Sequence, residues 1–224
     1  MKGEMNLISL FIAGGWVMYP ILFLSVIALT ITMERLIVVF LQKLKLKPEK
    51  FLIMFEKTFQ ETSGDKAKTV EIMEQFISKK NGMVVEILSA ALKKFKDGTA
   101  KKMGPMELKT WMKTSVEERA NTELPALESH LGALAVIANI ATLMGLFGTV
   151  MGMIESFTAM ANSPGGVKAD EMAGGIAVAL VATAGGLVVA VPSLILFNLI
   201  KANIEGFVLQ IEETTTDVID KLSE

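Results

Sequence analysis

Two long stretches without a charged side chain constrain this chain more than any other feature of its sequence. Residues 131–154 and 172–200 contain 24 and 29 consecutive residues without Asp, Glu, Lys or Arg. At a rise of about 1.5 Å per residue, a helix of either length spans the roughly 30 Å hydrocarbon core of a membrane. The sequence therefore predicts a hairpin of two membrane-spanning helices.

The composition agrees with a membrane protein and excludes several functions. Hydrophobic residues make up 51% of the 224 residues, which is more than an ordinary soluble domain holds. The chain has no cysteine, so disulfides, thiolate metal sites and a cysteine nucleophile are excluded. It also lacks a glycine-rich phosphate loop and the HExxH and GxSxG motifs. We therefore expect no enzymatic activity, no metal and no cofactor, and the net charge of −2 gives no sign of nucleic-acid binding.

A third uncharged run covers residues 5–33 and is interrupted by Gly14, Gly15 and Pro20. These residues divide it into a short interfacial helix at 7–13 and a spanning helix that follows. A cleavable signal peptide is the alternative, but the apolar run is too long and lacks a small-residue cleavage site. The sequence thus predicts three spanning helices in an all-α integral membrane protein.

Basic residues are concentrated in one loop. Residues 41–130 hold 17 of the 22 Lys and Arg, whereas the connection between the two hairpin limbs has only Lys168. The positive-inside rule places this loop in the cytoplasm, with the N-terminus periplasmic and the C-terminus cytoplasmic. The three spanning helices are predicted at 16–40, 131–160 and 171–200. An interfacial N-terminal segment at 1–15 precedes them, and a cytoplasmic C-terminal helix at 201–224 follows them. A cytoplasmic helical loop at 41–130 joins the first two spans, and a periplasmic loop at 161–170 joins the last two.

The cytoplasmic loop has helical periodicity, and Gly64, Gly82 and Gly98 are expected to separate its helices. An apolar stripe continues through residues 116–134, which predicts that the second spanning helix begins in the cytoplasm as one long helix, bent at Pro125. A similar stripe extends the third spanning helix toward the C-terminus.

Each hairpin limb carries a seam of small and hydroxyl residues on one face, because these residues recur at spacings of three and four. The seams are Ala138, Thr142, Gly145, Thr149, Gly152 and Ser156 on the first limb, and Gly175, Ala179, Thr183, Gly186, Ala190 and Ser193 on the second. One interpretation is close helix packing alone. The other is that Thr149 and Thr183 face a shared polar interior, which would make a pore-lining set of Thr149, Thr183, Thr142, Gly145, Gly152, Ala179 and Gly186.

Few ionisable residues lie near the predicted spans. We interpret Glu34 and Arg35 as a snorkelling pair at the end of the first span, and His130 as a solvated residue at the inner boundary. Glu155 either lines a vestibule or reaches interfacial water. Neither limb has a carboxylate at mid-membrane, and hydroxyls relay protons but do not store them at ordinary pH. A titrating acid is therefore expected from another subunit.

Two segments of the hairpin carry a resemblance to a known family. They are Gly145-Leu-Phe-Gly-Thr-Val-Met-Gly152 and Gly175-Ile-Ala-Val-Ala-Leu-Val-Ala-Thr-Ala-Gly-Gly-Leu-Val-Val-Ala-Val-Pro192, followed by Asn198. Over residues 131–206 the chain resembles the MotA/TolQ/ExbB proton channel family, and within it ExbB and TolQ. The resemblance implies a pentameric ring around an ExbD- or TolR-like single-span partner that brings the proton-carrying Asp.

The resemblance also implies residue roles and a function. Thr149 and Thr183 are similar to the family's pore-facing threonines, and Pro192 to the proline that kinks its last span. Val178 stands where enteric relatives have a glutamate, and Gly174 replaces a proline, so a relay through that glutamate is not carried over. The implied function is a proton-driven motor subunit of the bacterial inner membrane that energises a TonB- or TolA-like transducer. A non-conducting scaffold is the alternative, whereas a MotA-type stator subunit has four spans.

Overall fold

The computed structural model describes residues 7–162 and 169–224, and within these ranges all regular structure is helical. The helices are α1 (Leu7–Ala13), α2 (Met18–Lys45), α3 (Pro48–Glu61), α4 (Lys66–Ser78), α5 (Met83–Ala100), α6 (Pro105–Glu128), α7 (Leu131–Ala161) and α8 (Ala169–Ser223). The all-α prediction is thus confirmed for the described residues. Most of the predicted 161–170 loop, and the start of the predicted 1–15 segment, lie outside them.

Three helical stretches within the described residues are long and apolar enough to cross a membrane. They are Met18–Glu61, Pro105–Ala161 and Met172–Ser223. Their apolar parts lie in α2, α7 and α8, the three helices expected to span, so the number of spans agrees with the prediction.

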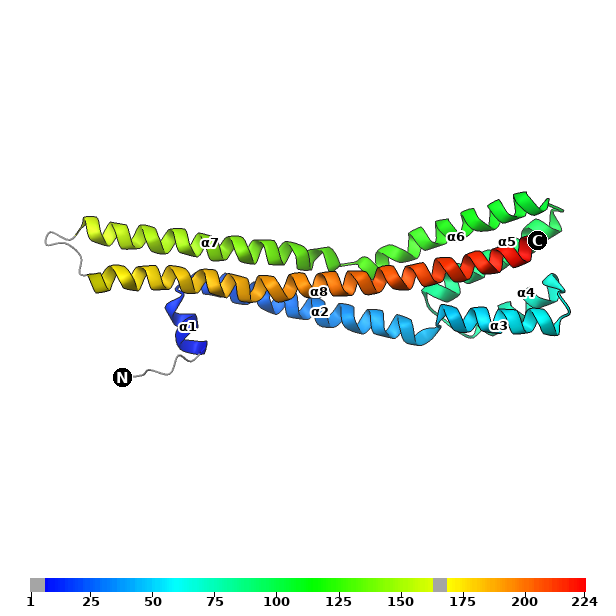
Figure 1. Ribbon diagram of the computed structural model, residues 1–224, viewed down its shortest axis with the longest axis horizontal. Coiled ribbons are helices and arrows are strands. Elements are labelled where there is room, and N and C mark those ends of the chain that lie inside the picture. The colour runs from blue at the N-terminus through cyan, green and yellow to red at the C-terminus, as the bar shows by residue number, and fades with distance from the viewer. Residues whose placement is uncertain (1–6, 163–168) are drawn as a thin grey trace. The chain divides into compact units, whose positions relative to one another are not determined.

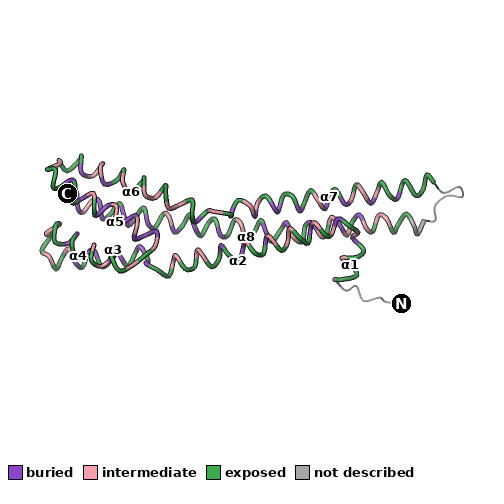
Figure 2. The backbone as a smooth tube through the Cα atoms, turned by 180° about the vertical axis from the view of Figure 1, so that it is seen from behind, coloured by how far each residue is buried: buried purple, intermediate pink, exposed green. Residues whose placement is uncertain are grey.

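The chain divides into two compact units, and the first contains Met1–Glu34 and His130–Leu199. In this unit α7 and the first part of α8 run side by side in opposite directions (Figure 1). Buried and exposed residues alternate along both helices (Figure 2). The buried side of α7 consists largely of Ala, Gly and Ser in addition to Leu and Ile, so the two backbones can approach closely.

The start of α2 follows from the glycines that precede it. Gly15 has a φ of +70°, a conformation that favours glycine, and it ends the short helix α1 as the sequence predicts. Gly14 is buried, and a Cβ added there would lie 2.5 Å from Cγ of Met18. The rings of Phe11 and Tyr19 meet edge to face with centroids 5.4 Å apart, which fixes α1 against the beginning of α2.

The second unit contains Arg35–Ser129 and Ile200–Glu224. Its core is formed by apolar side chains from α3, α4, α5, α6 and the C-terminal part of α8. The largest fully buried ones are Phe51, Phe55, Met73, Ile87, Leu88, Leu92, Met112, Ile204 and Leu222. Ion pairs connect the last turn of α8 with other helices, between Lys109 and Asp220 and between Lys221 and Glu56. The predicted helical extension of the third span is therefore a packed part of this unit.

Two of the three glycines expected to separate the loop helices do so. Gly64 and Gly82 have φ angles of +80° and +137° and lie between helices. Gly98 was expected to do the same, but it lies inside α5 and is buried there. A Cβ at this position would lie 2.4 Å from Cδ1 of Leu108, so Gly98 permits a close helix contact and does not end the helix.

The prediction of one continuous helix from the cytoplasm into the second span is wrong. Pro125 lies inside α6, which continues to Glu128, and the bend expected there stays a prediction. The helical run is interrupted at Ser129 and His130, and His130 has a left-handed φ of +58°. The apolar stripe across residues 116–134 therefore lies on two helices. The spacing of apolar residues predicts a helical face, but it does not show where the backbone is briefly interrupted.

Candidate functional site

The two predicted seams meet in the contact between α7 and α8. Gly145 and Gly186 are buried there, and a Cβ added to Gly186 would lie 2.5 Å from the carbonyl oxygen of Ala141 and 3.0 Å from Cα of Gly145. Near the other end of the hairpin, a Cβ on Gly152 would lie 3.0 Å from Cβ of Ala179. The small residues thus allow contact between the backbones themselves, which agrees with the helix-packing interpretation of the seams.

Thr149 and Thr183 lie opposite each other in the same contact. Their hydroxyl oxygens are within hydrogen-bond distance of each other, and both side chains are partly buried. The carbonyl oxygen of Gly145 accepts from Thr183 at 3.1 Å and is 3.3 Å from the hydroxyl of Thr149. The two threonines and this carbonyl form a polar cluster, which we call the hydroxyl cluster.

The hydroxyl cluster has fewer protons than hydrogen-bond contacts. Each threonine hydroxyl has one O–H donor, so two protons serve three contacts. Thr183 can donate to Gly145 while Thr149 donates to Thr183, Thr149 can donate to Gly145 while Thr183 donates to Thr149, or both can donate to Gly145. In each arrangement at least one threonine oxygen keeps its accepting capacity for a further donor. The cluster can therefore reverse its hydrogen-bond direction and accept from an acid.

The other members of the predicted pore-lining set divide into two groups. Gly145, Gly152, Ala179 and Gly186 are buried between α7 and α8 of the same chain. Thr142 is exposed on α7, and its hydroxyl donates to the carbonyl of Ala138 at 3.0 Å. The structure thus brings Thr149 and Thr183 together and leaves Thr142 on the surface. The pore-lining role of all seven residues stays a prediction.

Pro192 and Glu155 were also singled out from the sequence. Pro192 lies inside α8, whose helical assignment continues through it. Proline has no N–H to donate to the preceding turn, and the hydroxyl of the next residue, Ser193, donates to the carbonyl of Val189 at 2.7 Å. Glu155 is exposed on α7, one residue before the buried Ser156. The kink at Pro192 and a vestibule role for Glu155 stay predictions.

Glu34 and His130 contact each other in the first unit. Nδ1 of His130 lies 3.5 Å from Oε1 of Glu34, and both side chains are substantially exposed. The sequence placed both residues at the membrane boundary but did not link them, because they are 96 positions apart in the chain. A signal for the pairing is not visible in a single sequence.

Arg35 differs from the snorkelling residue that was expected. It is only 4% exposed, and Nη1 donates to the carbonyl of Ala126 at 3.2 Å and lies 3.5 Å from that of Leu127. These carbonyls are in the last turn of α6, where backbone acceptors lack intrahelical donors and a positive charge is favourable. Arg35 therefore caps α6 from α2 in the second unit, and the snorkelling interpretation is wrong for this residue.

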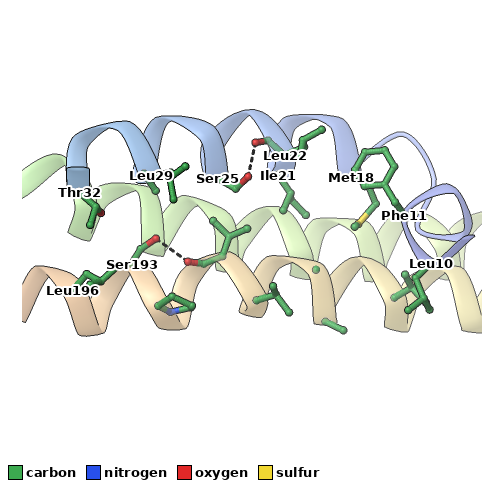
Figure 3. A pocket seen from close by; sticks show the side chains of 17 residues that line it. Leu10, Phe11, Met18, Ile21, Leu22, Ser25, Leu29, Thr32, Ser193 and Leu196 are labelled. Atoms are coloured by element: carbon green, nitrogen blue, oxygen red, sulfur yellow. Dashed lines mark hydrogen bonds between the residues drawn. The ribbon is translucent and has the colours of Figure 1, made fainter. Parts of the chain in front are cut away.

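The first unit also contains an apolar cavity that the sequence did not predict. It has a volume of about 540 Å³ and lies among α1, α2 and α8 (Figure 3). Its few polar side chains include Ser25 and Ser193, whose hydroxyls donate at 2.7 Å to carbonyls of their own helices, Leu22 and Val189. Such a lining suits an apolar group and offers little for a reaction. Among the described residues, no group of His, Cys, Asp or Glu is arranged to hold a metal ion.

Comparison with known proteins connects the hairpin with a family. The sequence model of the MotA/TolQ/ExbB proton channel family matches residues 79–213. Biopolymer transport protein ExbB of Pseudomonas putida is 38% identical over 93 residues, which are 42% of this chain and 28% of that protein. Tol-Pal system protein TolQ of Haemophilus influenzae is 33% identical over 103 residues, which are 46% of this chain and 43% of that protein.

A longer match extends over most of the chain. The ExbB-like 1 biopolymer transport protein of Synechocystis is 30% identical over 197 residues, which are 87% of this chain and 70% of that protein. The matches to the Pseudomonas and Haemophilus proteins span less than half of each relative. The family match includes both α7 and the apolar part of α8, and therefore the whole hydroxyl cluster.

Proposed function

The chain belongs to the MotA/TolQ/ExbB proton channel family, and from this premise we propose that it is a proton-channel subunit that couples proton motive force to work at the cell envelope. With three apolar helices and this family membership, it is a multi-pass protein of the inner membrane. The observation that carries the proposal is the hydroxyl cluster, because it places two exchangeable protons inside a hairpin without charged residues.

The proton carrier is proposed to come from a partner helix. Residues 131–154 and 172–200 contain no carboxylate, and hydroxyl groups do not hold an extra proton at neutral pH. A partner Asp that is protonated donates to a threonine oxygen of the cluster, whereas the ionised Asp accepts from a threonine O–H. Protonation therefore changes the preference of the partner for each cluster, and a proton gradient biases its position among the subunits.

The assembly is proposed to be a ring, with five copies around an ExbD- or TolR-like partner. Large apolar residues are exposed on the outer faces of α7 and α8 of the single chain, where they suit contact with lipid or with further copies. Among them are Leu143, Leu146, Val150, Leu180, Leu187 and Val188. The transducer would be TonB-like if the subunit acts as ExbB does, or TolA-like if it acts as TolQ does.

The proposed orientation follows from charge. Residues 41–130 hold 17 of the 22 basic residues, which supports a cytoplasmic location for the helices α3 to α6. The N-terminus would then be periplasmic and the C-terminus cytoplasmic. We also propose that the chain has no enzymatic activity of its own, since the hydroxyl cluster has neither a general base nor an activated nucleophile.

A non-conducting scaffold is the second candidate, and one observation favours it. Gly145, Gly152, Ala179 and Gly186 are all used in the contact between α7 and α8 of one chain, so packing alone accounts for them. Packing does not require two facing hydroxyls, since alanine and glycine pack as closely. The proton channel and the scaffold therefore make different predictions for Thr149 and Thr183, because only the channel requires their hydroxyls.

Proton flux into vesicles distinguishes the candidates. The full chain, co-purified with its ExbD- or TolR-like partner, is reconstituted in vesicles with a pH gradient. We expect flux that requires the partner and that falls at least tenfold in the double variant Thr149→Ala/Thr183→Ala, which removes both hydroxyls without adding an atom where they meet. The matched control is Thr30→Ala, which removes an exposed hydroxyl on α2 that donates to the carbonyl of Val26 in its own helix. Unchanged flux in the double variant would refute the proposed role of the hydroxyl cluster. Native mass spectrometry of the same complex tests the proposed ring of five copies, because it measures the stoichiometry.

A further inference from the structure

A cluster of lysines stands where the apolar surface of α2 ends. Four lysines occur in the eight residues from Lys43 to Lys50, and Glu49 is the only acid among them. Lys45, Lys47 and Lys50 are exposed. Among the ion pairs of the described residues, none involves these three lysines. Their charges are therefore available to an anionic partner.

The backbone fixes this lysine cluster in place. Leu46 and Pro48 alternate with the lysines and are buried, and Leu46 is only 4% exposed. α2 ends at Lys45 and α3 begins at Pro48, so two buried side chains anchor the turn. A Cβ on Gly82 would lie 3.1 Å from Cδ of Lys45, so that lysine is also packed along its stem.

An apolar surface leads directly to the lysines. Along the last turns of α2, the large side chains of Leu36, Ile37, Phe40, Leu41 and Leu44 are between 47% and 63% exposed. They belong to a helix long and apolar enough to cross a membrane. In a bilayer these side chains lie against acyl chains, and the lysines that follow lie at the height of the headgroups.

A groove joins the two surfaces. It has a volume of about 370 Å³ and is lined by Val38, Leu41, Gln42, Leu44 and Lys45. Val38 and Leu41 line it with apolar side chains, and Gln42 and Lys45, which follow them along α2 toward α3, contribute an amide and an ammonium group. This order of groups matches an amphiphile with an apolar chain and an anionic head.

We propose that this groove and the lysine cluster form a binding site for one anionic phospholipid of the surrounding leaflet. One acyl chain lies along Val38 and Leu41, and the phosphate lies among Lys45, Lys47 and Lys50, with Gln42 as an additional donor. The observations that identify the lipid are the excess of positive charge, the exposed apolar approach and the polar end of the groove. This site is separate from the hydroxyl cluster and does not depend on proton conduction.

The size of the effect follows from surface electrostatics. A lysine close to an anionic membrane surface contributes about fivefold to binding, so three lysines contribute roughly a hundredfold. We therefore expect Lys45→Gln/Lys47→Gln/Lys50→Gln to lose most of the preference for an anionic over a zwitterionic lipid. The matched control is Lys93→Gln/Lys102→Gln/Lys113→Gln, which removes the same charge from exposed lysines of α5, α6 and the turn between them.

The test uses the full chain in nanodiscs made of nine parts phosphatidylcholine and one part phosphatidylglycerol. Native mass spectrometry of the released protein measures which lipid is retained, and glycerol 3-phosphate serves as a soluble competitor for the headgroup. We expect the wild type and the control variant to retain phosphatidylglycerol, the triple variant to lose that preference, and the soluble competitor to have no effect because it lacks a chain for the groove.

Three results would overturn the proposal. They are equal retention of phosphatidylglycerol by the triple variant and the wild type, an equal loss in the control variant, and complete displacement by glycerol 3-phosphate. If the triple variant does not fold, salt titration of the wild type replaces it. Retention that does not fall between 0.05 and about 0.5 M salt, where exposed charges become screened, would also refute the site.

Discussion

The hydroxyl groups of Thr149 on α7 and Thr183 on α8 hydrogen-bond to each other, and the carbonyl oxygen of Gly145 lies within reach of both. The pair is held by a contact between glycine backbones, so its geometry does not depend on flexible side chains. Function and stability can consequently be separated by experiment at these two positions.

Replacing both threonines by alanine tests that separation. Alanine removes both hydroxyls and adds no atom where they meet, and a hydrogen bond between helices in a membrane contributes only about 0.6 kcal/mol on average. We expect Thr149→Ala/Thr183→Ala to lower the free energy of unfolding in mixed micelles by about 2 kcal/mol or less, including the loss of two partly buried methyl groups, while proton flux is lost. A destabilisation of several kcal/mol would mean that the cluster is mainly structural.

Gly186→Ala tests how much the backbone contact between α7 and α8 contributes to stability. Its new Cβ would lie 2.5 Å from the backbone oxygen of Ala141, which cannot move without displacing α7. We expect a loss of roughly 1–3 kcal/mol in unfolding free energy, typical of an overpacked contact. Gly132→Ala is the control, since nothing lies within 4 Å of its added Cβ. That variant should be neutral or stabilised by up to about 1 kcal/mol through helix propensity.

His130→Gly tests the break between α6 and α7. A left-handed conformation costs a non-glycine residue about 1–2 kcal/mol, and His130 adopts it with a φ of +58°. The contact with Glu34 is largely exposed, so its loss costs little. We expect His130→Gly to raise the thermal midpoint and His130→Val to lower it. A lower midpoint for the glycine variant would show that the contact with Glu34 outweighs the backbone strain.

We expect acid to lower the stability of the second unit, because the carboxylate of Asp65 that caps the N-terminus of α4 becomes protonated. The backbone N–H of Lys68 donates to the carboxylate of Asp65, and this hydrogen bond lowers the pKa of Asp65 below its ordinary value of 3.8. A group with a lowered folded-state pKa stabilises the protein above its unfolded-state pKa, and this stabilisation is lost as the pH falls through the folded-state pKa.

Asp65→Asn keeps the cap but cannot titrate. We expect similar unfolding curves for wild type and variant at pH 7. Below pH 4 the wild type should lose more stability than the variant, as followed by circular dichroism during denaturant titration. Parallel acid dependence of the two proteins would exclude Asp65 as a source of the effect.

Much of the fold could be predicted from the sequence because membrane spans are long and their composition is distinctive. The three apolar helices agree with the structure, as do the glycine breaks at Gly15, Gly64 and Gly82. The errors concern short features. Gly98 was expected to end a helix, but it instead lets Leu108 pack closely against the helix. A glycine that ends a helix and a glycine that permits a close contact look the same in the local sequence.

For the candidate site, the sequence predicted the helix faces that carry the two threonines, but not that these faces contact each other. A spacing of three and four places Thr149 and Thr183 on the seams of their helices, but periodicity does not reveal which helix a seam contacts. The structure shows that the seams contact each other within one chain. The buried Arg35 could not be anticipated for the same reason, because its acceptors at Ala126 and Leu127 are 91 and 92 positions away.

The backbone contact between Gly145 and Gly186 has a mechanical consequence. Where two helices touch through their main chains, no layer of side chains remains that could be compressed or rearranged between them. We therefore expect α7 and the adjoining part of α8 to move together as one rigid body. Side-chain rearrangement in this unit is then expected at the apolar cavity among α1, α2 and α8.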